Sequence, residues 1–333
     1  MANLTQHRVF IGRFQPFHLG HKQVIDTAFE QCDHVIVLVG SANSPRTLKN
    51  PFSFEERAQM ILGAFESLPA HKTLTCLPLN DATYNDQRWL RYVQSAVASV
   101  TKDDHLVGII GHNKDSSSYY LHLFPQWQFW ETASFADGLS ATPIRMTYFQ
   151  TGAILQDKLP QSSAKLLAAF YDTPAYAQLH QEYQAQERHH QSWQHAPYPP
   201  TFITADAVVI MAGHILLIER GGDYGHGLWA LAGGFVDGNE TFVECAIREL
   251  KEEAGIDVRH LSPKKTAIFD APDRSLRGRT VTMAVLFELT GDTLPTPSAG
   301  DDASRAFWLP LSELEAVRMF EDHYAIICQM LGI

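Results

Sequence analysis

The sequence predicts an α/β protein made of two domains, and three observations support this. The chain has 333 residues, whereas a single domain usually has about 100–200. In the first half, short apolar runs alternate with helical patterns, which is typical of a parallel sheet covered by helices. In the second half, paired strand patterns and amphipathic helices indicate an α+β domain. We expect domains at residues 1–186 and 201–333, with a linker at 187–200.

Four apolar strands and three amphipathic helices account for the predicted sheet of the first domain. The strand segments are short and rich in Val, Ile and Leu, which favours burial on both faces. We expect strands at 8–12, 34–40, 74–79 and 105–111, and helices at 21–31, 54–65 and 86–100. Ligands on such sheets bind beyond the carboxyl ends of the strands. The loops that follow the strands are therefore the candidate binding segments.

The rest of the chain divides at a polar stretch. Residues 162–186 carry a helical pattern that Pro174 interrupts, and the polar stretch after them ends in Pro199 and Pro200. Two prolines in a row cannot continue a helix, which makes this stretch the predicted linker. Beyond it we expect a hairpin at 203–221, a strand at 280–289 and a closing amphipathic helix at 311–331.

The composition favours a globular protein in a reducing compartment. The formal net charge of −11 argues against general electrostatic binding of nucleic acid or of an anionic membrane. The four cysteines are far apart and show no metal-ligand spacing, so free thiols are expected. The N-terminal segment lacks the pattern of a signal peptide, and no apolar run approaches the roughly 20 residues of a membrane helix. We expect a cytoplasmic protein with no nucleic-acid or membrane partner; a homo-oligomer stays open.

The first candidate site is the stretch GRFQPFHLGH, which follows the first predicted strand. A turn from a strand into a helix gathers free backbone N–H groups at the positive end of the helix, which suits a phosphate. Gly12 and Gly20 would let a ligand approach the backbone closely. His18 and His21 can donate hydrogen bonds to phosphate oxygens, and Arg13 can bind a second phosphate. The alternative is that Gly20 only eases packing and the histidines lie on the surface.

A second segment, LSATPIR, supports a phosphate site. Ser140 or Thr142 can cap the start of a helix. Arg145 would then lie near its first turn, directed at the same phosphates. By itself, the segment is better explained as an ordinary capped helix with a solvated arginine.

Together these motifs resemble the signatures of the HxGH nucleotidyltransferases, specifically the archaeal-type nicotinamide mononucleotide (NMN) adenylyltransferases. The Arg-Phe-Gln-Pro within the first motif discriminates against other branches of that superfamily. The resemblance covers residues 1–186 and implies a Rossmann-like domain that transfers an adenylyl group from ATP to NMN with Mg²⁺. It implies catalytic roles for His18, His21 and Arg145. The substrate would be bound by Gly12, Arg13, Phe14, Gln15, Ser140 and Thr142.

Further residues of this domain are weaker candidates for binding the substrates. Family members stack an aromatic ring on the nicotinamide, a role that Trp89 could fill, although a tryptophan in an amphipathic helix is more often part of the core. Asp81 and Asn85 could hold polar groups of NMN. Lys114 follows the fourth predicted strand and could reach a phosphate, or be a solvated loop lysine.

The second candidate site is the stretch GGFVDGNETFVECAIRELKEEAGI. Its helix would place Glu249, Glu252 and Glu253 on one face, where like charges repel. A divalent cation would turn this repulsion into coordination by hard oxygen ligands. The stretch matches the full Nudix box, which implies hydrolysis of a nucleoside diphosphate linked to another group.

The box also implies the parts that its residues play. Glu249, Glu252, Glu253 and the carbonyl of Gly233 would bind Mg²⁺, with Mn²⁺ as an alternative. Glu249 and Glu253 would be catalytic, although the sequence does not separate metal binding from acceptance of a proton. Glu240 and Arg248 would brace the loop and the helix.

Substrate choice lies outside the box, in the stretch FDAPDRSLRGR. It resembles a segment of ADP-ribose pyrophosphatases, which implies substrate binding by Arg274 and Arg277. Ser275 and Leu276 depart from that segment, which leaves the exact substrate open. Arg220 could contact a phosphate or lie on the surface.

Both halves together resemble the bifunctional NMN adenylyltransferase/Nudix hydrolase family. This implies an enzyme that makes NAD from NMN and ATP and hydrolyses ADP-ribose to AMP and ribose 5-phosphate. One alternative keeps both folds but changes both substrates. Another is a sensor whose Nudix domain binds an NAD metabolite without hydrolysing it, although the three intact glutamates speak against that.

Overall fold

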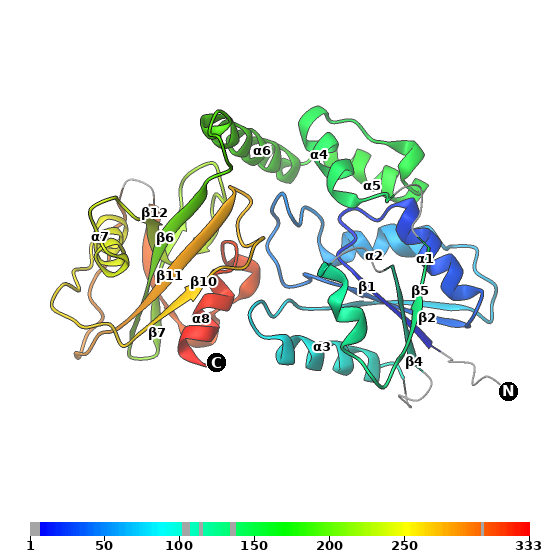
Figure 1. Ribbon diagram of the computed structural model, residues 1–333, viewed down its shortest axis with the longest axis horizontal. Helices are drawn as coiled ribbons and strands as arrows, with labels where there is room; N and C mark the ends of the chain where they lie inside the picture. Colours follow the sequence, from blue (N-terminus) through cyan, green and yellow to red (C-terminus); the bar gives the residue numbers. More distant parts are fainter. Residues whose placement is uncertain (1–6, 102–106, 113–115, 134–137, 301–302) are drawn as a thin grey trace. The chain divides into compact units, whose positions relative to one another are not determined.

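The computed structural model describes residues 7–101, 107–112, 116–133, 138–300 and 303–333. The chain divides into two compact units, Met1–His180 and Gln181–Ile333, and each is described by itself. The first unit is built on five strands, as Figure 1 shows. These are β1 (His7–Gly12), β2 (His34–Val39), β3 (Thr73–Pro78), β4 (Val107–Gly111) and β5 (Gln128–Glu131).

The sheet of the first unit is parallel throughout, with the order β3-β2-β1-β4-β5. The helices are α1 (Leu19–Phe29), α2 (Phe54–Gly63), α3 (Asp86–Ala98), α4 (Ala141–Thr151) and α5 (Gln161–Tyr171), with short 3₁₀ helices η2 (Ser116–His122) and η3 (Gln156–Lys158). One apolar cluster joins alternate residues of the central strands to Val93 and Val97 of α3. Helices α1 and α2 lie on the other side of the sheet (Figure 1). The four predicted strands and three predicted helices are present, which confirms the Rossmann-like α/β prediction.

Helix α6 (Pro174–Trp193) crosses the division between the two units. It begins at the proline where the sequence predicts a break, since a proline fits the first turn of a helix. The helix then continues through residues 187–193, so this part of the predicted linker is helical. The domain boundaries themselves stay a prediction.

The second unit contains a mixed sheet of seven strands. They are β6 (Thr201–Met211), β7 (His214–Arg220), β8 (Trp229–Ala230), β9 (Ala232–Phe235), β10 (Lys265–Phe269), β11 (Arg279–Glu288) and β12 (Ala303–Pro310). Strands β6 and β11 are parallel, whereas β9 pairs with β6 in antiparallel fashion. The predicted hairpin is present as β6 and β7. This mixed sheet confirms the α+β prediction.

Two helices cover the sheet of the second unit, α7 (Phe242–Ala254) on one face and α8 (His323–Leu331) on the other (Figure 1). Buried residues of α7, including Cys245 and Leu250, join alternate residues of β6 in one core. Within the described residues, no helix combines the length and the apolar character that crossing a bilayer requires.

The predicted closing helix at 311–331 is wrong over its first part. The chain there forms two short 3₁₀ helices, η4 (Leu311–Glu313) and η5 (Ala316–Arg318), and only His323–Leu331 is α-helical. Phe320 donates its backbone N–H to the carbonyl of Trp229 at 2.8 Å, and Glu321 has a φ of 45°. Pairing with β8 and a left-handed residue therefore interrupt the helical pattern.

Candidate active sites

The turn after β1 holds His18 and His21 through a reciprocal cap at the start of α1. The backbone N–H of His21 donates to Nδ1 of His18, and the N–H of His18 donates to Nδ1 of His21, both at 3.3 Å. The two rings stack with centroids 3.5 Å apart. Burial, with His18 as a further cause, holds the pKa of His21 well below its usual value. Because Nδ1 of His21 accepts a hydrogen bond, its neutral ring carries the proton on Nε2 and can donate it.

The glycine and the phenylalanine of the motif pack against each other. A Cβ on Gly12 would lie 2.8 Å from Cζ of Phe14. Phe14 has a φ of 53° and is 1% exposed, and its ring meets that of His21 edge to face at 4.9 Å. Gly12 thus makes room for Phe14, and Phe14 supports His21 from behind.

The side chain of Gln15 is hydrogen-bonded to the backbone of a loop that is distant in the sequence. Its side chain donates to the carbonyl of Phe52 at 2.9 Å and accepts from the N–H of Phe52 at 3.0 Å. Gln15 is 2% exposed. These contacts fix the turn after β1 against the start of α2, so the amide acts as a support in this structure.

Arg145 reaches the same turn from α4. Its Nη1 donates to the carbonyl of Gln15 at 2.7 Å, and its Nε has no hydrogen-bond partner among the described residues. Burial, and next the charge of Arg13, lower the pKa of Arg145 to about 10. Arg13 therefore lies close enough to Arg145 for their guanidinium groups to interact, an arrangement that an anion could stabilise.

The remaining predicted residues of this unit differ in their placement. Ser140 is the N-cap residue of α4, but its side chain makes no capping hydrogen bond, and Thr142 is exposed in the first turn. Asn85 caps α3 by accepting from the N–H of Arg88 at 2.9 Å. Trp89 packs on Tyr120 and Phe124 at the edge of the core.

Two further candidates lie in loops after the strands. Asp81 follows β3 and accepts from the hydroxyl of Ser44, in the loop after β2, at 3.3 Å. Lys114 lies outside the described residues.

The structure adds Arg57 of α2, which sequence reasoning missed. Its guanidinium donates to the carbonyls of Arg13, Gly40, Ser41 and Ser53, and its side chain is fully buried. Burial lowers its pKa to about 10. Arg57 ties the turn after β1 to the end of β2. Its partners are backbone carbonyls, so no sequence pattern reveals them.

In the second unit, Arg248 gathers three carboxylates of the Nudix box. It forms a two-pronged pair with Glu240, at 3.0 and 2.7 Å, and also donates to Glu249 at 2.7 Å and Glu252 at 2.9 Å. The hydrogen bond from Arg248 is the main cause that lowers the pKa of Glu240 to about 2. Arg248 and Glu240 therefore brace the loop before α7 against the helix.

Two carboxylates of α7 lie against the glycines of β9. Oε2 of Glu253 accepts from the N–H of Gly233 at 2.9 Å, and a Cβ on Gly234 would lie 2.2 Å from Oε1 of Glu249. Burial raises the pKa of Glu253 to about 7 and also raises the pKa of Glu249. The double glycine is thus a cradle for carboxylate oxygens, the ligands that Mg²⁺ and Mn²⁺ take.

The four predicted metal ligands are near one another but are not gathered around one point. Glu252 is turned outward to Arg248, with 59% of its side chain exposed. Across the described part of the chain, no three His, Cys, Asp or Glu side chains are arranged as a metal site. The donor chemistry fits a divalent cation, and Glu249 and Glu253 are the two carboxylates that lie against β9.

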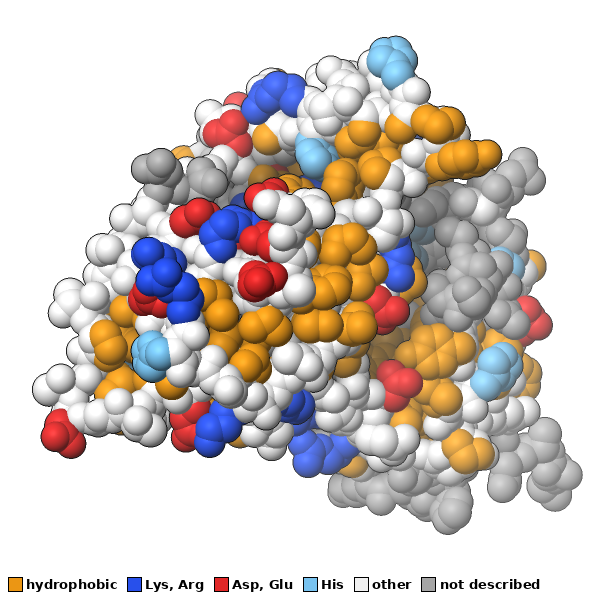
Figure 2. Space-filling view, turned by 60° about the vertical axis from the view of Figure 1, so that its left-hand side comes forward, with side chains coloured by type: hydrophobic (Ala, Val, Ile, Leu, Met, Phe, Trp, Pro, Cys, Tyr) orange, Lys and Arg blue, Asp and Glu red, His pale blue; other side chains and the backbone are white. Residues whose placement is uncertain are grey.

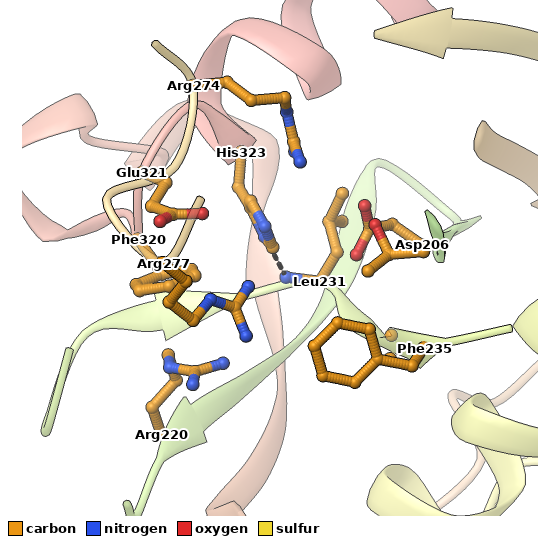
Figure 3. A pocket seen from close by; sticks show the side chains of 12 residues that line it. Asp206, Arg220, Leu231, Phe235, Arg274, Arg277, Phe320, Glu321 and His323 are labelled. Carbon is orange, nitrogen blue, oxygen red and sulfur yellow. Dashed lines mark hydrogen bonds between the residues drawn. The ribbon is translucent and has the colours of Figure 1, made fainter. Parts of the chain in front are cut away.

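A pocket lies beside β9, and Figure 3 shows its lining. Arg220 packs on the ring of Phe320, with Cζ 4.1 Å from its centroid. Arg277 lies over the rings of Tyr224, Phe235 and Phe320 at 5.5–5.9 Å. Burial and the neighbouring Arg277 lower the pKa of Arg220. Two adjacent guanidinium groups over aromatic rings can bind a phosphate.

Arg274, the third predicted substrate arginine, is already paired. Its Nε and Nη2 donate to the two carboxylate oxygens of Asp322 at 3.0 and 2.9 Å, and only 2% of its side chain is exposed. His323 follows Asp322, and its Nδ1 accepts from the N–H of Leu231 at 3.0 Å (Figure 3). Arg274 therefore holds the start of α8 against the pocket.

The surface in Figure 2 carries mixed charges. Acidic and basic side chains alternate on the face that it presents, with apolar side chains between them. On this face the positive groups do not form one continuous patch.

These features define a class: a nucleotidyltransferase-like α/β unit followed by a Nudix unit. Comparison with family models agrees, since residues 9–146 match the cytidylyltransferase-like model and residues 201–330 match the NUDIX domain. A nicotinamide/nicotinic acid mononucleotide adenylyltransferase of Acinetobacter baylyi is 44% identical over 179 residues, which are 54% of this chain and 94% of the relative.

Solved structures match the whole chain. A bifunctional NMN adenylyltransferase/ADP ribose pyrophosphatase from Francisella tularensis has a TM-score of 0.92 and 36% identity, over 98% of each chain. The same kind of protein complexed with AMP and a Mn ion has a TM-score of 0.91 and 35% identity, again over 98% of each chain. This chain belongs to the bifunctional NMN adenylyltransferase/ADP-ribose pyrophosphatase family.

Proposed function

We propose that the first unit transfers the adenylyl group of ATP to NMN, giving NAD and pyrophosphate. The observation that carries this proposal is the stacked pair His18 and His21, which caps α1 beside Arg13 and Arg145. The A. baylyi relative is named for both nicotinamide and nicotinic acid mononucleotide. Both mononucleotides should therefore be assayed.

The proposed transfer needs no protein nucleophile. The phosphate of NMN attacks the α-phosphorus of ATP in line, and pyrophosphate leaves. His21, through its Nε2–H, and His18 donate to phosphate oxygens, while Arg13 and Arg145 offset the negative charge. Bound Mg²⁺ would supply further neutralisation of the triphosphate. Asp81, Asn85, Trp89, Ser140, Thr142 and Lys114 stay proposed contacts of the substrates.

We propose that the second unit hydrolyses ADP-ribose to AMP and ribose 5-phosphate. Glu249, Glu252, Glu253 and the carbonyl of Gly233 would hold Mg²⁺ or Mn²⁺, which would supply an activated water and offset the charge of the diphosphate. The relative crystallised with AMP and a Mn ion supports this choice. Glu249 or Glu253 would accept the proton of that water.

The pocket beside β9 is the proposed place of the substrate. Arg220 and Arg277 would bind the diphosphate side, and Arg274 would position α8 rather than touch the substrate. All four cysteines are free thiols, which supports action in a reducing compartment such as the cytoplasm.

Two substitutions test the proposed functions separately. His18→Ala should lower NAD formation from NMN and ATP by about 100-fold or more and leave ADP-ribose hydrolysis unchanged. Glu253→Gln should abolish ADP-ribose hydrolysis and leave NAD formation unchanged. If NAD formation were unchanged in the first variant, His18 would not belong to the site. If a folded Glu253→Gln protein lost both activities, the assignment of two separate sites would be wrong.

A further inference from the structure

The pocket of the Nudix unit contains a carboxylate that the proposed chemistry does not use. Asp206 lies on β6, directly opposite Gly233 of β9, and is 6% exposed. Its Oδ2 accepts from the hydroxyl of Thr282 at 2.6 Å. Among the described residues, its Oδ1 has no hydrogen-bond partner. Asp206 nevertheless lines the pocket (Figure 3).

The other carboxylates near the pocket have partners within the protein or a role proposed for the cation. Glu321 accepts from the hydroxyl of Tyr224 at 2.8 Å, and Asp322 is paired with Arg274. Glu253 accepts from Gly233. Solvent reaches Oδ1 of Asp206 in the pocket. A substrate that displaced this solvent without supplying a donor would leave a desolvated carboxylate oxygen, which is costly. The free oxygen of Asp206 therefore indicates a donor that arrives with the substrate.

The chemistry of the pocket limits what that donor can be. Burial raises the pKa of Asp206, with Arg274 opposing. For the ionised side chain, a phosphate is excluded as the direct partner because the two charges have the same sign. Figure 3 shows Asp206 across the pocket from Arg220 and Arg277, so phosphates have a better place on the arginine side. The partner must carry an O–H or N–H group.

Position favours a sugar hydroxyl over the amino group of the base. A Cβ on Gly233 would lie 2.3 Å from Oδ1 of Asp206, and the N–H of the same glycine contacts Glu253. Asp206 is thus next to the carboxylates proposed to carry the cation and the diphosphate. In ADP-ribose both riboses are bonded directly to the diphosphate, whereas adenine lies one ribose further away.

We propose that Oδ1 of Asp206 accepts a hydrogen bond from a ribose hydroxyl and thereby selects ribosyl over deoxyribosyl diphosphates. This inference rests on the proposed Nudix function. Asp206 acts on substrate choice, whereas the glutamates of α7 act on the reacting diphosphate.

The test compares kcat/KM for ADP-ribose with that for four analogues. Two analogues contain 2′- or 3′-deoxyadenosine, and two carry 2- or 3-deoxyribose as the terminal sugar. The variants are Asp206→Asn, which still accepts from Thr282, and Asp292→Asn, an exposed aspartate, as the matched control. Thermal melting checks that each variant is folded.

The wild-type protein should discriminate against one analogue by about 10- to 100-fold, the worth of a hydrogen bond to a charged group. Asp206→Asn should lower kcat/KM for ADP-ribose by a similar factor but hardly change it for that analogue, whereas the control should keep the full discrimination. The analogue affected tells which ribose is read. If Asp206→Asn lowered kcat/KM equally for ADP-ribose and all four analogues, the residue would be structural and the inference wrong. Failure of wild-type protein to hydrolyse ADP-ribose would instead overturn the proposed function.

Discussion

The double glycine of β9 leads to a specific prediction. One added methyl group there should lower the hydrolytic activity strongly and the stability only slightly. In Gly234→Ala the new Cβ would lie 2.2 Å from Oε1 and 2.6 Å from Cδ of Glu249. Real contacts need more than 3 Å, so the carboxylate must move by about 1 Å or more. The carboxylate is the end of a flexible side chain and can swing away.

The two effects of this substitution differ in size. The displaced Glu249 loses its hydrogen bond to Arg248, a partly exposed ion pair, which should cost no more than about 1 kcal/mol. A misplacement of about 1 Å in a reacting group can cost about 100-fold in rate. We therefore expect ADP-ribose hydrolysis to fall about 100-fold while the melting temperature changes by only a few degrees.

The assay is kcat/KM for ADP-ribose, with NAD formation measured on the same preparation as an internal control. Gly238→Ala is the matched variant, because a Cβ there would meet nothing within 4 Å, and it should keep both activities. Full hydrolytic activity of Gly234→Ala would refute the reasoning, since it would show that Glu249 need not lie against β9. A large fall in melting temperature would also refute it.

Three further substitutions test the supports of the two sites. Gln15→Ala removes both hydrogen bonds to Phe52 and should lower the free energy of unfolding of the first unit by about 2–3 kcal/mol in a denaturant titration; an unchanged midpoint would contradict this. Arg274→Met removes both hydrogen bonds that the buried Asp322 accepts from Arg274 and should cost about 3–5 kcal/mol, whereas Arg274→Met with Asp322→Leu should recover much of it; no recovery would argue against the pair. Burial lowers the pKa of His323 to about 3; nearby arginines add to this effect and Asp322 opposes it. The contribution of neutral His323 to the stability of the fold is therefore complete above pH 6.5 and is lost as the pH falls toward 3. At pH 5 the loss should be about 2 kcal/mol, and His323→Asn should remove it; equal acid sensitivity of both proteins would count against that pKa.

Sequence patterns predicted β1, β2 and β4 well because these strands are buried on both faces and read as continuous apolar runs. They also predicted the half-buried β3, but not β5, which is short and has exposed ends. They were weaker where structure depends on distant partners. Strand β10 has an exposed, mixed pattern, and β9 is only Ala232–Phe235, so neither has a periodicity of its own. The closing helix failed because Phe320 pairs with Trp229, a contact that no local pattern contains.

The candidate sites show the same division between local and distant information. His18, His21 and the Nudix glutamates are tied to local motifs. The structure places the histidines at the start of α1 and Glu249, Glu252 and Glu253 on α7. Gln15 and Arg274 were chosen because their segments resemble family motifs, yet in the structure their side chains are hydrogen-bonded to Phe52 and Asp322. Arg57 could not be found at all, because its partners are carbonyls from other segments.

The paired histidines at the start of α1 make one set of atoms serve two tasks. The Nδ1 atoms that cap the start of α1 also fix which edge of each ring faces outward. A serine at position 18 could start the helix just as well but would offer no ring to a nucleotide. A single substitution at position 18 can therefore remove activity while the first turn of α1 still folds. Such an inactive protein would keep the fold of the wild-type protein.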